Sequence, residues 1–217
     1  MKKCYGKGPI MKKTILITIA VSVIVAVLFN GCKRKEQSDK DTGTKKTLDF
    51  ALKNYDGNTV QLSDYKGQIV VLEWFNYECP FSNYHYEKAN TMIDLAKKYK
   101  DKNVIWLAIN STNFIKAEQN EAYAKKHNIP YPILDDSKGT VGRAFDAQRT
   151  PHVFIIDINE GIAYNGAIDN APIGKSPDGQ EYINYVDKAL IELTKGQTVS
   201  TRQTPPYGCT VKYANEL

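Results

Sequence analysis

The sequence predicts a mixed α/β fold, with a central sheet that carries helices on both faces. Two near-continuous apolar runs, 68–75 and 103–110, are typical of strands buried on both sides of a sheet. Segments with helical spacing of apolar residues separate the runs, and two more apolar runs flank the turn at 159–161. Strands that alternate with helices and end in an antiparallel pair indicate a mixed sheet with right-handed parallel crossovers.

The elements follow one another without an internal repeat. We expect an N-terminal β-hairpin, because Asp56-Gly57 is a turn signal between two short apolar segments. One amphipathic helix is expected from about Ser82 to Tyr99. The expected strands are 48–52, 59–62, 68–75, 103–110, 131–134, 151–157 and 162–166, and the other helical segments are 117–127, 137–145 and 180–194.

Composition is that of one ordinary domain with tails. The chain has 217 residues, of which 42% are apolar, and this is enough for a single core. Its net charge of +5 comes largely from basic residues before residue 36, and no basic stripe is interleaved with aromatic residues. We therefore predict no nucleic-acid partner. The predicted parts are an export segment, 1–32, a disordered linker, 33–46, a folded domain, 47–195, and a C-terminal tail, 196–217.

The N-terminal segment has the pattern of a secretory signal. An apolar run of 16 residues, 14–29, follows Lys12-Lys13 and is shorter than the ~20 residues that span a membrane. Residues 28–32, LFNGC, resemble a bacterial lipobox, which implies that Cys32 becomes lipidated. We predict an exported, membrane-anchored lipoprotein on the periplasmic or cell-surface side. The alternative is an uncleaved N-terminal anchor.

Cys79 lies where the buried strand 68–75 gives way to the following helix. Free N–H groups and the positive end of the helix dipole favour a thiolate there, and a thiolate attacks disulfides and peroxides. The alternative interpretation is a small buried hydrophobic residue. The tail supplies a second thiol, Cys209, whereas the sequence holds no Cys-x-x-Cys pair and no Cys/His cluster. We therefore expect no metal and no cofactor.

The region from about Leu48 to Leu193 resembles the thioredoxin fold, and within it the redoxins of the AhpC/TSA family. The motifs that carry the resemblance are an entry hairpin at 56–67, Cys79-Pro80-Phe81 after a buried strand, Thr150-Pro151-His152, and the tail segment 205–213. The Cys-Pro-Phe and tail motifs are similar to those of a subgroup with a single active-site cysteine. The resemblance implies a thioredoxin-like redoxin domain over 47–195, with Pro151 in a cis-proline loop that faces Cys79 and offers a backbone edge to substrate.

The motifs also depart from the family patterns. Ser82 replaces the second cysteine of a thioredoxin, so its hydroxyl can hydrogen-bond the thiolate but cannot form a disulfide. Leu72 and Asn76 stand in the proline and threonine positions of peroxiredoxins. Pro151 lies near the position of the peroxide-binding arginine, for which Arg149 or Arg143 is a candidate replacement.

Further candidate residues follow from the resemblance. Glu73 has the position of a buried acid beneath the site, where burial would raise its pKa and suit a proton shuttle; a partner for a nearby lysine is the alternative. Cys209, on a turn-forming arm 130 residues after Cys79, is a candidate resolving thiol or a free or intermolecular cysteine. His152 is expected to be a loop side chain rather than a modulator of the thiolate. Thr150 and Pro151 are expected to face substrate.

Three functions remain open from the sequence. The first is a thiol-dependent oxidoreductase in which Cys79 attacks a protein disulfide or oxidised thiol and an external thiol supplies electrons. The second is a peroxidase that reduces a small peroxide through a Cys79 sulfenic acid. The third is a non-enzymatic module that binds protein thiols.

Overall fold

The computed structural model describes residues 48–214. The predicted export segment, the lipidation site Cys32 and the linker 33–46 lie outside the described residues, as do residues 215–217. None of the helices in the described part is long and apolar enough to cross a membrane.

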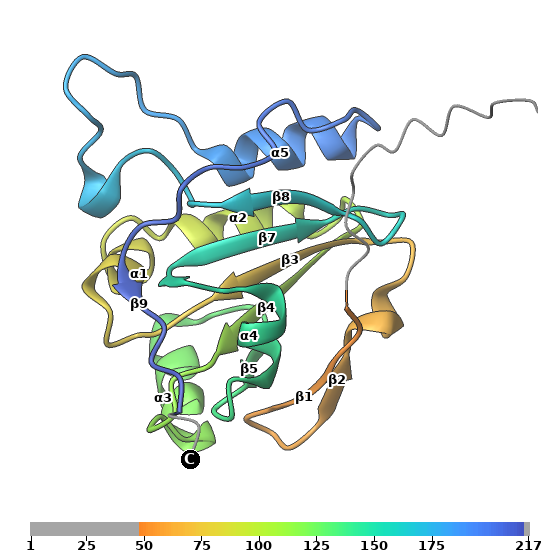
Figure 1. The fold of residues 1–217 in the computed structure, drawn as a ribbon, viewed down its shortest axis with the longest axis vertical. Coiled ribbons are helices and arrows are strands. Elements are labelled where there is room, and N and C mark those ends of the chain that lie inside the picture. The colour runs from red at the N-terminus through yellow and green to blue at the C-terminus, as the bar shows by residue number, and fades with distance from the viewer. Residues whose placement is uncertain (1–47, 215–217) are drawn as a thin grey trace, which may run out of the picture. The chain divides into compact units, whose positions relative to one another are not determined.

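A seven-stranded mixed sheet forms the centre of the described unit, in the order β2-β1-β5-β4-β3-β7-β8 (Figure 1). Its strands are β1 (Ala51–Asn54), β2 (Thr59–Gln61), β3 (Ile69–Trp74), β4 (Val104–Asn110), β5 (Ile133–Asp135), β7 (His152–Ile156) and β8 (Ile162–Gly166). Strand β4 runs parallel to both β3 and β5, whereas β7 is antiparallel to β3 and β8. The predicted hairpin is present as β1 and β2, which are antiparallel.

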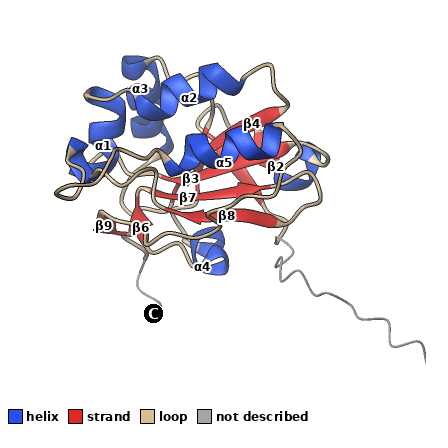
Figure 2. Ribbon diagram, turned by 90° about the horizontal axis from the view of Figure 1, so that it is seen from above, coloured by secondary structure: helices blue, strands red, loops and turns tan. Residues whose placement is uncertain are grey.

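Strand β3 lies near the middle of the sheet, and all six of its residues are buried. Because side chains alternate along a strand, Val71 packs into one core cluster and Leu72 into the other. The first cluster includes residues of α2 (Thr91–Tyr99), α3 (Ala117–His127) and α5 (Tyr185–Thr194), and the second includes residues of α4 (Thr140–Phe145). Helices therefore cover both faces, as predicted (Figure 2).

The predicted helix from Ser82 to Tyr99 is wrong in one respect, because it is two helices. Helix α1 (Pro80–Glu87) ends before Asn90, and α2 begins directly after it. Asn90 has a left-handed backbone with φ of 52°, which interrupts the helical hydrogen bonds. The apolar spacing continues across the break, so periodicity could not reveal it. Similarly, α5 begins at Tyr185 rather than residue 180, because the Asn184 side chain caps it by accepting from the Asp187 N–H.

The C-terminal tail is built into the domain. Its strand β9 (Cys209–Thr210) pairs antiparallel with β6 (Arg149–Thr150) to make a separate two-stranded sheet (Figure 2). Earlier in the tail, the Thr204 N–H donates to the Asn165 carbonyl of β8 at 3.1 Å. Later, the Asn113 N–H donates to the Lys212 carbonyl at 3.0 Å. Two short 3-10 helices, η1 (Leu62–Tyr65) and η2 (Pro172–Gly174), complete the described elements.

Candidate active site

The local chain conformation places Cys79 at the start of α1. Cys79 is the N-cap residue, with extended backbone angles, and Pro80 takes the first helical position. The Asn76 carbonyl accepts from the Cys79 N–H, and the Asn76 side chain accepts from the Glu78 N–H, so this residue shapes the loop before the thiol. The Cys79 side chain is only 2% exposed, and its thiol donates to the Thr150 carbonyl oxygen at 2.8 Å.

Opposing influences act on the Cys79 thiol. Burial by itself raises the pKa of Cys79, because it disfavours the charged thiolate. Hydrogen bonds from the Cys209 thiol, the Thr150 side chain and the Ser82 N–H outweigh that effect, so the pKa lies below that of a free thiol. The site therefore favours the nucleophilic form of the thiol, as expected at a helix N-terminus.

Cys209 lies beside Cys79 because the small sheet brings the tail there. In the β6–β9 register, Cys209 is directly opposite Thr150, whose carbonyl oxygen contacts Cys79. No disulfide joins Cys79 to Cys209 in this structure. Burial and the proximity of Cys79 raise the pKa of Cys209 to about 11. The two thiols thus differ in chemical character, because the pKa of Cys79 is lowered and that of Cys209 is raised.

The cis-proline loop is present, with a cis peptide bond between Thr150 and Pro151. Gly208 lies against this loop with φ of 103°, a backbone angle that side-chain-bearing residues rarely adopt. A Cβ atom at this position would collide with the Thr150 carbonyl oxygen and crowd the Phe81 side chain. The glycine therefore permits the close approach of the tail to the site.

A partly buried hydrogen-bond network anchors the tail two residues before Cys209. The Tyr207 hydroxyl donates to Asp169 Oδ1 at 2.8 Å and lies 2.8 Å from His85 Nε2. The other ring nitrogen of His85 lies 3.1 Å from the Thr91 hydroxyl. The network joins the tail to α1, α2 and the loop after β8. Sequence reasoning placed Tyr207 within the tail motif 205–213 but gave it no role, and it did not identify Asp169, which belongs to no local motif.

A second anchor follows Cys209. The Tyr213 hydroxyl donates to the Ala147 carbonyl at 2.7 Å, and the Arg143 guanidinium stacks on the Tyr213 ring. Arg143 is therefore engaged with the tail. The other arginine considered as a replacement, Arg149, is on β6 opposite Thr210.

Glu73 is fully buried beneath the site, on the face of β3 that packs against α1. Burial raises its pKa to about 8, although the hydrogen bond from Tyr86 and the nearby Trp106 indole partly offset this effect. The Tyr86 hydroxyl donates to Glu73 at 2.7 Å and lies 3.0 Å from the Tyr131 hydroxyl. Within residues 48–214, no hydrogen bond links Glu73 directly to Cys79, and Tyr86 connects Glu73 to the helix that Cys79 begins.

The structure changes the role expected of Ser82 and specifies the role of His152. The Ser82 hydroxyl is buried and has no hydrogen-bond partner among the described residues, so Ser82 acts on Cys79 through its backbone N–H. His152 accepts from the Gln148 N–H at 3.2 Å and pairs with Asn165 at 2.6 Å. Burial lowers the pKa of His152 to about 4. His152 is therefore a neutral side chain that braces the cis-proline loop.

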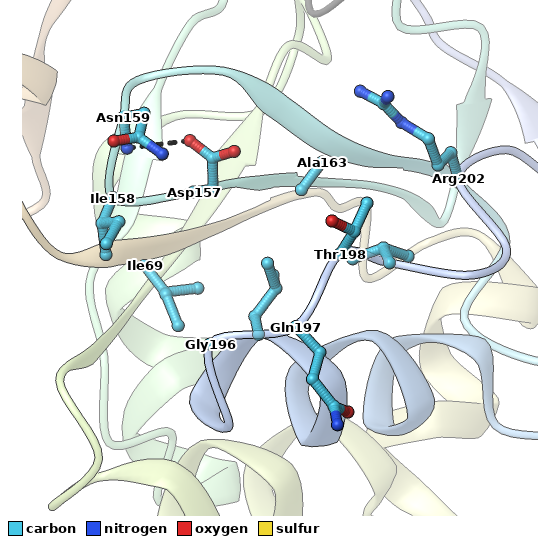
Figure 3. A pocket seen from close by; sticks show the side chains of 11 residues that line it. Ile69, Asp157, Ile158, Asn159, Ala163, Gly196, Gln197, Thr198 and Arg202 are labelled. Atoms are coloured by element: carbon cyan, nitrogen blue, oxygen red, sulfur yellow. Dashed lines mark hydrogen bonds between the residues drawn. The ribbon is translucent and has the colours of Figure 1, made fainter. Parts of the chain in front are cut away.

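The described residues contain no group of three or more metal-ligating side chains. A cavity of about 310 Å³ lies between the β7–β8 turn, the end of α5 and the tail, with Asp157, Gln197 and Thr198 among its lining residues (Figure 3). Neither cysteine lines this cavity.

Comparison with known proteins identifies one matching family, described as the AhpC/TSA family, over residues 44–165. The thioredoxin-like protein YneN of Bacillus subtilis is 32% identical over 113 residues, which are 50% of this chain and 62% of YneN. The thiol-disulfide oxidoreductase ResA of Bacillus thuringiensis is 24% identical over 151 residues, covering 70% of this chain and 83% of ResA. The peroxiredoxin Bcp of Bacillus subtilis is 28% identical over 111 residues, covering 47% of this chain and 62% of Bcp.

Among solved structures, an uncharacterised conserved protein from Geobacillus kaustophilus has a TM-score of 0.72 and 29% identity, and the match covers 80% of this chain and 93% of that one. A putative thioredoxin from Neisseria meningitidis has a TM-score of 0.50 and 24% identity, and the match covers 63% of this chain and 83% of that one. Together with the family match, the sheet order and the cis-proline loop, this similarity confirms the predicted thioredoxin-like fold.

Proposed function

The chain belongs to the AhpC/TSA family, and from that premise we propose that it is a thiol-dependent oxidoreductase in which Cys79 is the nucleophile and Cys209 its intramolecular partner. One observation carries the proposal: β6 and β9 hold Cys209 opposite Thr150, whose carbonyl oxygen accepts from the Cys79 thiol at 2.8 Å, and the pKa of that thiol is lowered. A nucleophile and a second thiol held side by side are the parts that a two-step exchange requires.

In the first step, the Cys79 thiolate attacks one sulfur of a substrate disulfide, and the other sulfur leaves as a thiolate. In the second step, Cys209 loses its proton to solvent or to the departing thiolate and attacks the Cys79 sulfur. The Cys79–Cys209 disulfide forms, and the rest of the substrate leaves reduced. An external thiol then returns two electrons to the protein. Thr150 and Pro151 form the loop against which the substrate lies.

The second candidate function is peroxide reduction. The thiolate of Cys79 would take one oxygen from a hydroperoxide, releasing an alcohol or water, and Cys209 would displace water from the resulting sulfenic acid. The observation that favours it is the low exposure of Cys79, 2%, which suits a small oxidant better than a large one. The absence of threonine and proline at 76 and 72 counts against rapid peroxide reduction.

The experiment is a stopped-flow comparison of the reduced protein with hydrogen peroxide and with glutathione disulfide, followed by mass spectrometry of the products. Rapid reaction with glutathione disulfide and a Cys79–Cys209 disulfide as product would support thiol–disulfide exchange. Rapid reaction with peroxide only would establish the peroxidase alternative. Slow reaction with both oxidants would contradict the two enzyme proposals, and a non-enzymatic module that binds protein thiols would be the remaining function. Cys79→Ser keeps Cys209 and is the matched control, because any reaction that persists in this variant occurs at a thiol other than Cys79.

For location, we propose that the protein is exported and anchored in the membrane through a lipid on Cys32. The support is the basic start, the short apolar run and the LFNGC segment of the sequence. Metabolic labelling with a fatty-acid analogue should mark the wild-type chain and leave Cys32→Ala unmarked. Equal labelling of the two chains would contradict the proposal.

A further inference from the structure

We propose that the external reductant attacks the Cys79–Cys209 disulfide at the Cys209 sulfur, and that this reductant is a thiol that carries negative charge. The inference rests on the function proposed above, which supplies the disulfide. It assigns the tail a second task, as the place where electrons enter.

Access to the two sulfurs differs. Cys79 is 2% exposed and lies beneath the Thr150 carbonyl, while Gly208 of the tail packs against Thr150 and Phe81. Cys209 is partly exposed, and its strand β9 is an edge strand of a sheet that has only two strands. A thiolate attacks in line with the disulfide, from the side opposite the leaving sulfur, so access to the attacked sulfur controls the reaction. Of the two sulfurs, that of Cys209 is the more accessible while the tail stays in place.

The leaving group favours the same sulfur. The thiol with the lower pKa leaves faster in disulfide exchange. The pKa of Cys79 is lowered, whereas burial and the proximity of Cys79 raise the pKa of Cys209. A Cys209 sulfur in a disulfide cannot donate to Cys79, but the Thr150 side chain and the Ser82 N–H remain to stabilise the departing Cys79 thiolate. Attack at Cys209 therefore expels the better leaving group.

The electrons and protons balance over two attacks. The first external thiolate forms a bond to the Cys209 sulfur, the Cys79–Cys209 bond breaks, and Cys79 leaves as a thiolate. A second external thiolate attacks the external sulfur of the mixed disulfide on Cys209. The external disulfide is released, and Cys209 takes a proton from solvent. Two external thiols are oxidised, and one protein disulfide is reduced.

Charge around Cys209 indicates the kind of thiol. Two cations, Lys212 and Arg149, act on Cys209 through their charge. Arg149 lies opposite Thr210 in the register, and Lys212 donates to the Thr210 hydroxyl at 3.2 Å. Within residues 48–214, neither cation forms an ion pair with a carboxylate. Their field favours the approach of an anionic thiol, and salt weakens it.

The first test locates the mixed disulfide on the wild-type protein. The protein is oxidised and its Cys79–Cys209 disulfide is confirmed by mass spectrometry before any thiol is added. Limiting glutathione is then mixed in, the reaction is stopped with acid at early times, and peptides are mapped. Glutathione on Cys209 is expected, and glutathione on Cys79 would overturn the inference. Failure to form the initial disulfide would instead contradict the proposed function.

The second test concerns charge and compares glutathione, which is an anion near neutral pH, with uncharged 2-mercaptoethanol. We expect Lys212→Gln to slow reduction by glutathione roughly 3- to 10-fold and to change the rate with 2-mercaptoethanol less than about 2-fold. Lys100→Gln, an exposed lysine after α2, is the matched control and should change neither rate. Equal effects of Lys212→Gln on both thiols would overturn the assignment of an anionic reductant.

Discussion

At the scale of single residues, the site depends on the different environments of two thiols. Cys79 begins a helix and accepts several hydrogen bonds, whereas Cys209 donates one to Cys79 and has its pKa raised. This difference supports the roles proposed for the two thiols, because the thiolate is the attacking form.

The mutual influence of the thiols can be measured in a chain that begins at residue 46, which contains only these two cysteines. Cys209→Ala removes a donor to Cys79, so the pKa of Cys79 should rise. Cys79→Ala removes a neighbour that raises the pKa of Cys209, so that pKa should fall from about 11. Ultraviolet absorbance of the thiolate against pH reports both values. A Cys79 pKa that does not rise in Cys209→Ala would contradict the proposed hydrogen bond.

Glu73 makes stability depend on pH. Its pKa is raised from 4.5 to about 8 in the folded state, so the folded protein holds a proton that the unfolded chain has released. The stability that Glu73 contributes is therefore fully present below about pH 4.5, and this contribution is lost as pH rises through about 8. The slope is at most roughly 1.4 kcal/mol per pH unit.

Glu73→Gln should remove most of this dependence, because the amide resembles the protonated carboxyl and can still accept from Tyr86. Urea denaturation at several pH values between about 5 and 9 measures the effect. The exposed Glu118→Gln on α3 is the control and should retain the wild-type slope. If the Glu73→Gln and wild-type slopes coincide, Glu73 does not titrate in this window.

At the scale of elements, the β6–β9 pair brings the second thiol to the first. The pair has only two residues in each strand, so the hydrogen bonds around it must hold the tail in place. The Val211 N–H donates to the Gln148 carbonyl at 3.2 Å, and Tyr207 is bound to Asp169 and His85. A strand this short is stabilised by its anchors rather than by its own ladder.

Tyr207→Phe tests the anchor, since it keeps the ring and removes the hydroxyl. We expect a stability loss of about 1–2 kcal/mol and faster amide exchange at 209–211, because buried hydrogen-bond partners lose their donor or acceptor. Tyr99→Phe removes a comparable tyrosine–aspartate bond, to Asp187, between α2 and α5. The control should lose stability without faster exchange at 209–211. Equal exchange in the two variants would contradict a local role for Tyr207.

At the scale of the whole described unit, the tail extends the domain beyond residues 44–165, which the family model matches. Val199 is buried in the core, and the Thr204 side chain accepts from the Ala167 N–H at 2.9 Å. The tail then passes α1 at β9 (Figure 1), and its Lys212 carbonyl accepts from the Asn113 N–H of the loop after β4. Residues 205–214 therefore cover the site, while residues 196–204 complete the core.

Truncation after Thr204 separates these two parts. The shortened chain should unfold cooperatively at a lower denaturant concentration, and iodoacetamide should modify Cys79 at least about tenfold faster, because the cover is gone. Cys209→Ser in the full chain is the control, since it removes the second thiol and keeps the cover. Mass spectrometry measures both rates. Equal modification of Cys79 in the truncated and control chains would show that the tail does not shield it.

Local patterns were enough to predict most of the sheet. The apolar runs that became β3 and β4 and the turn signal at Asp56-Gly57 each act over a few neighbouring residues, so they can be read from the sequence. The break at Asn90 was not predictable in this way, because one left-handed residue leaves the apolar spacing unchanged. The cis bond at Pro151 was expected from the family resemblance alone.

By itself, the sequence determined the α/β fold class, the placement of Cys79 between a buried strand and a helix, and the burial of Glu73. Only the tertiary structure decided that Cys209 lies opposite Thr150 and that Tyr207 holds it there. The physical reason is separation along the chain. A contact between residues 130 positions apart depends on the packing of every element between them. A two-residue strand is also too short for its sequence pattern to indicate which strand it pairs with.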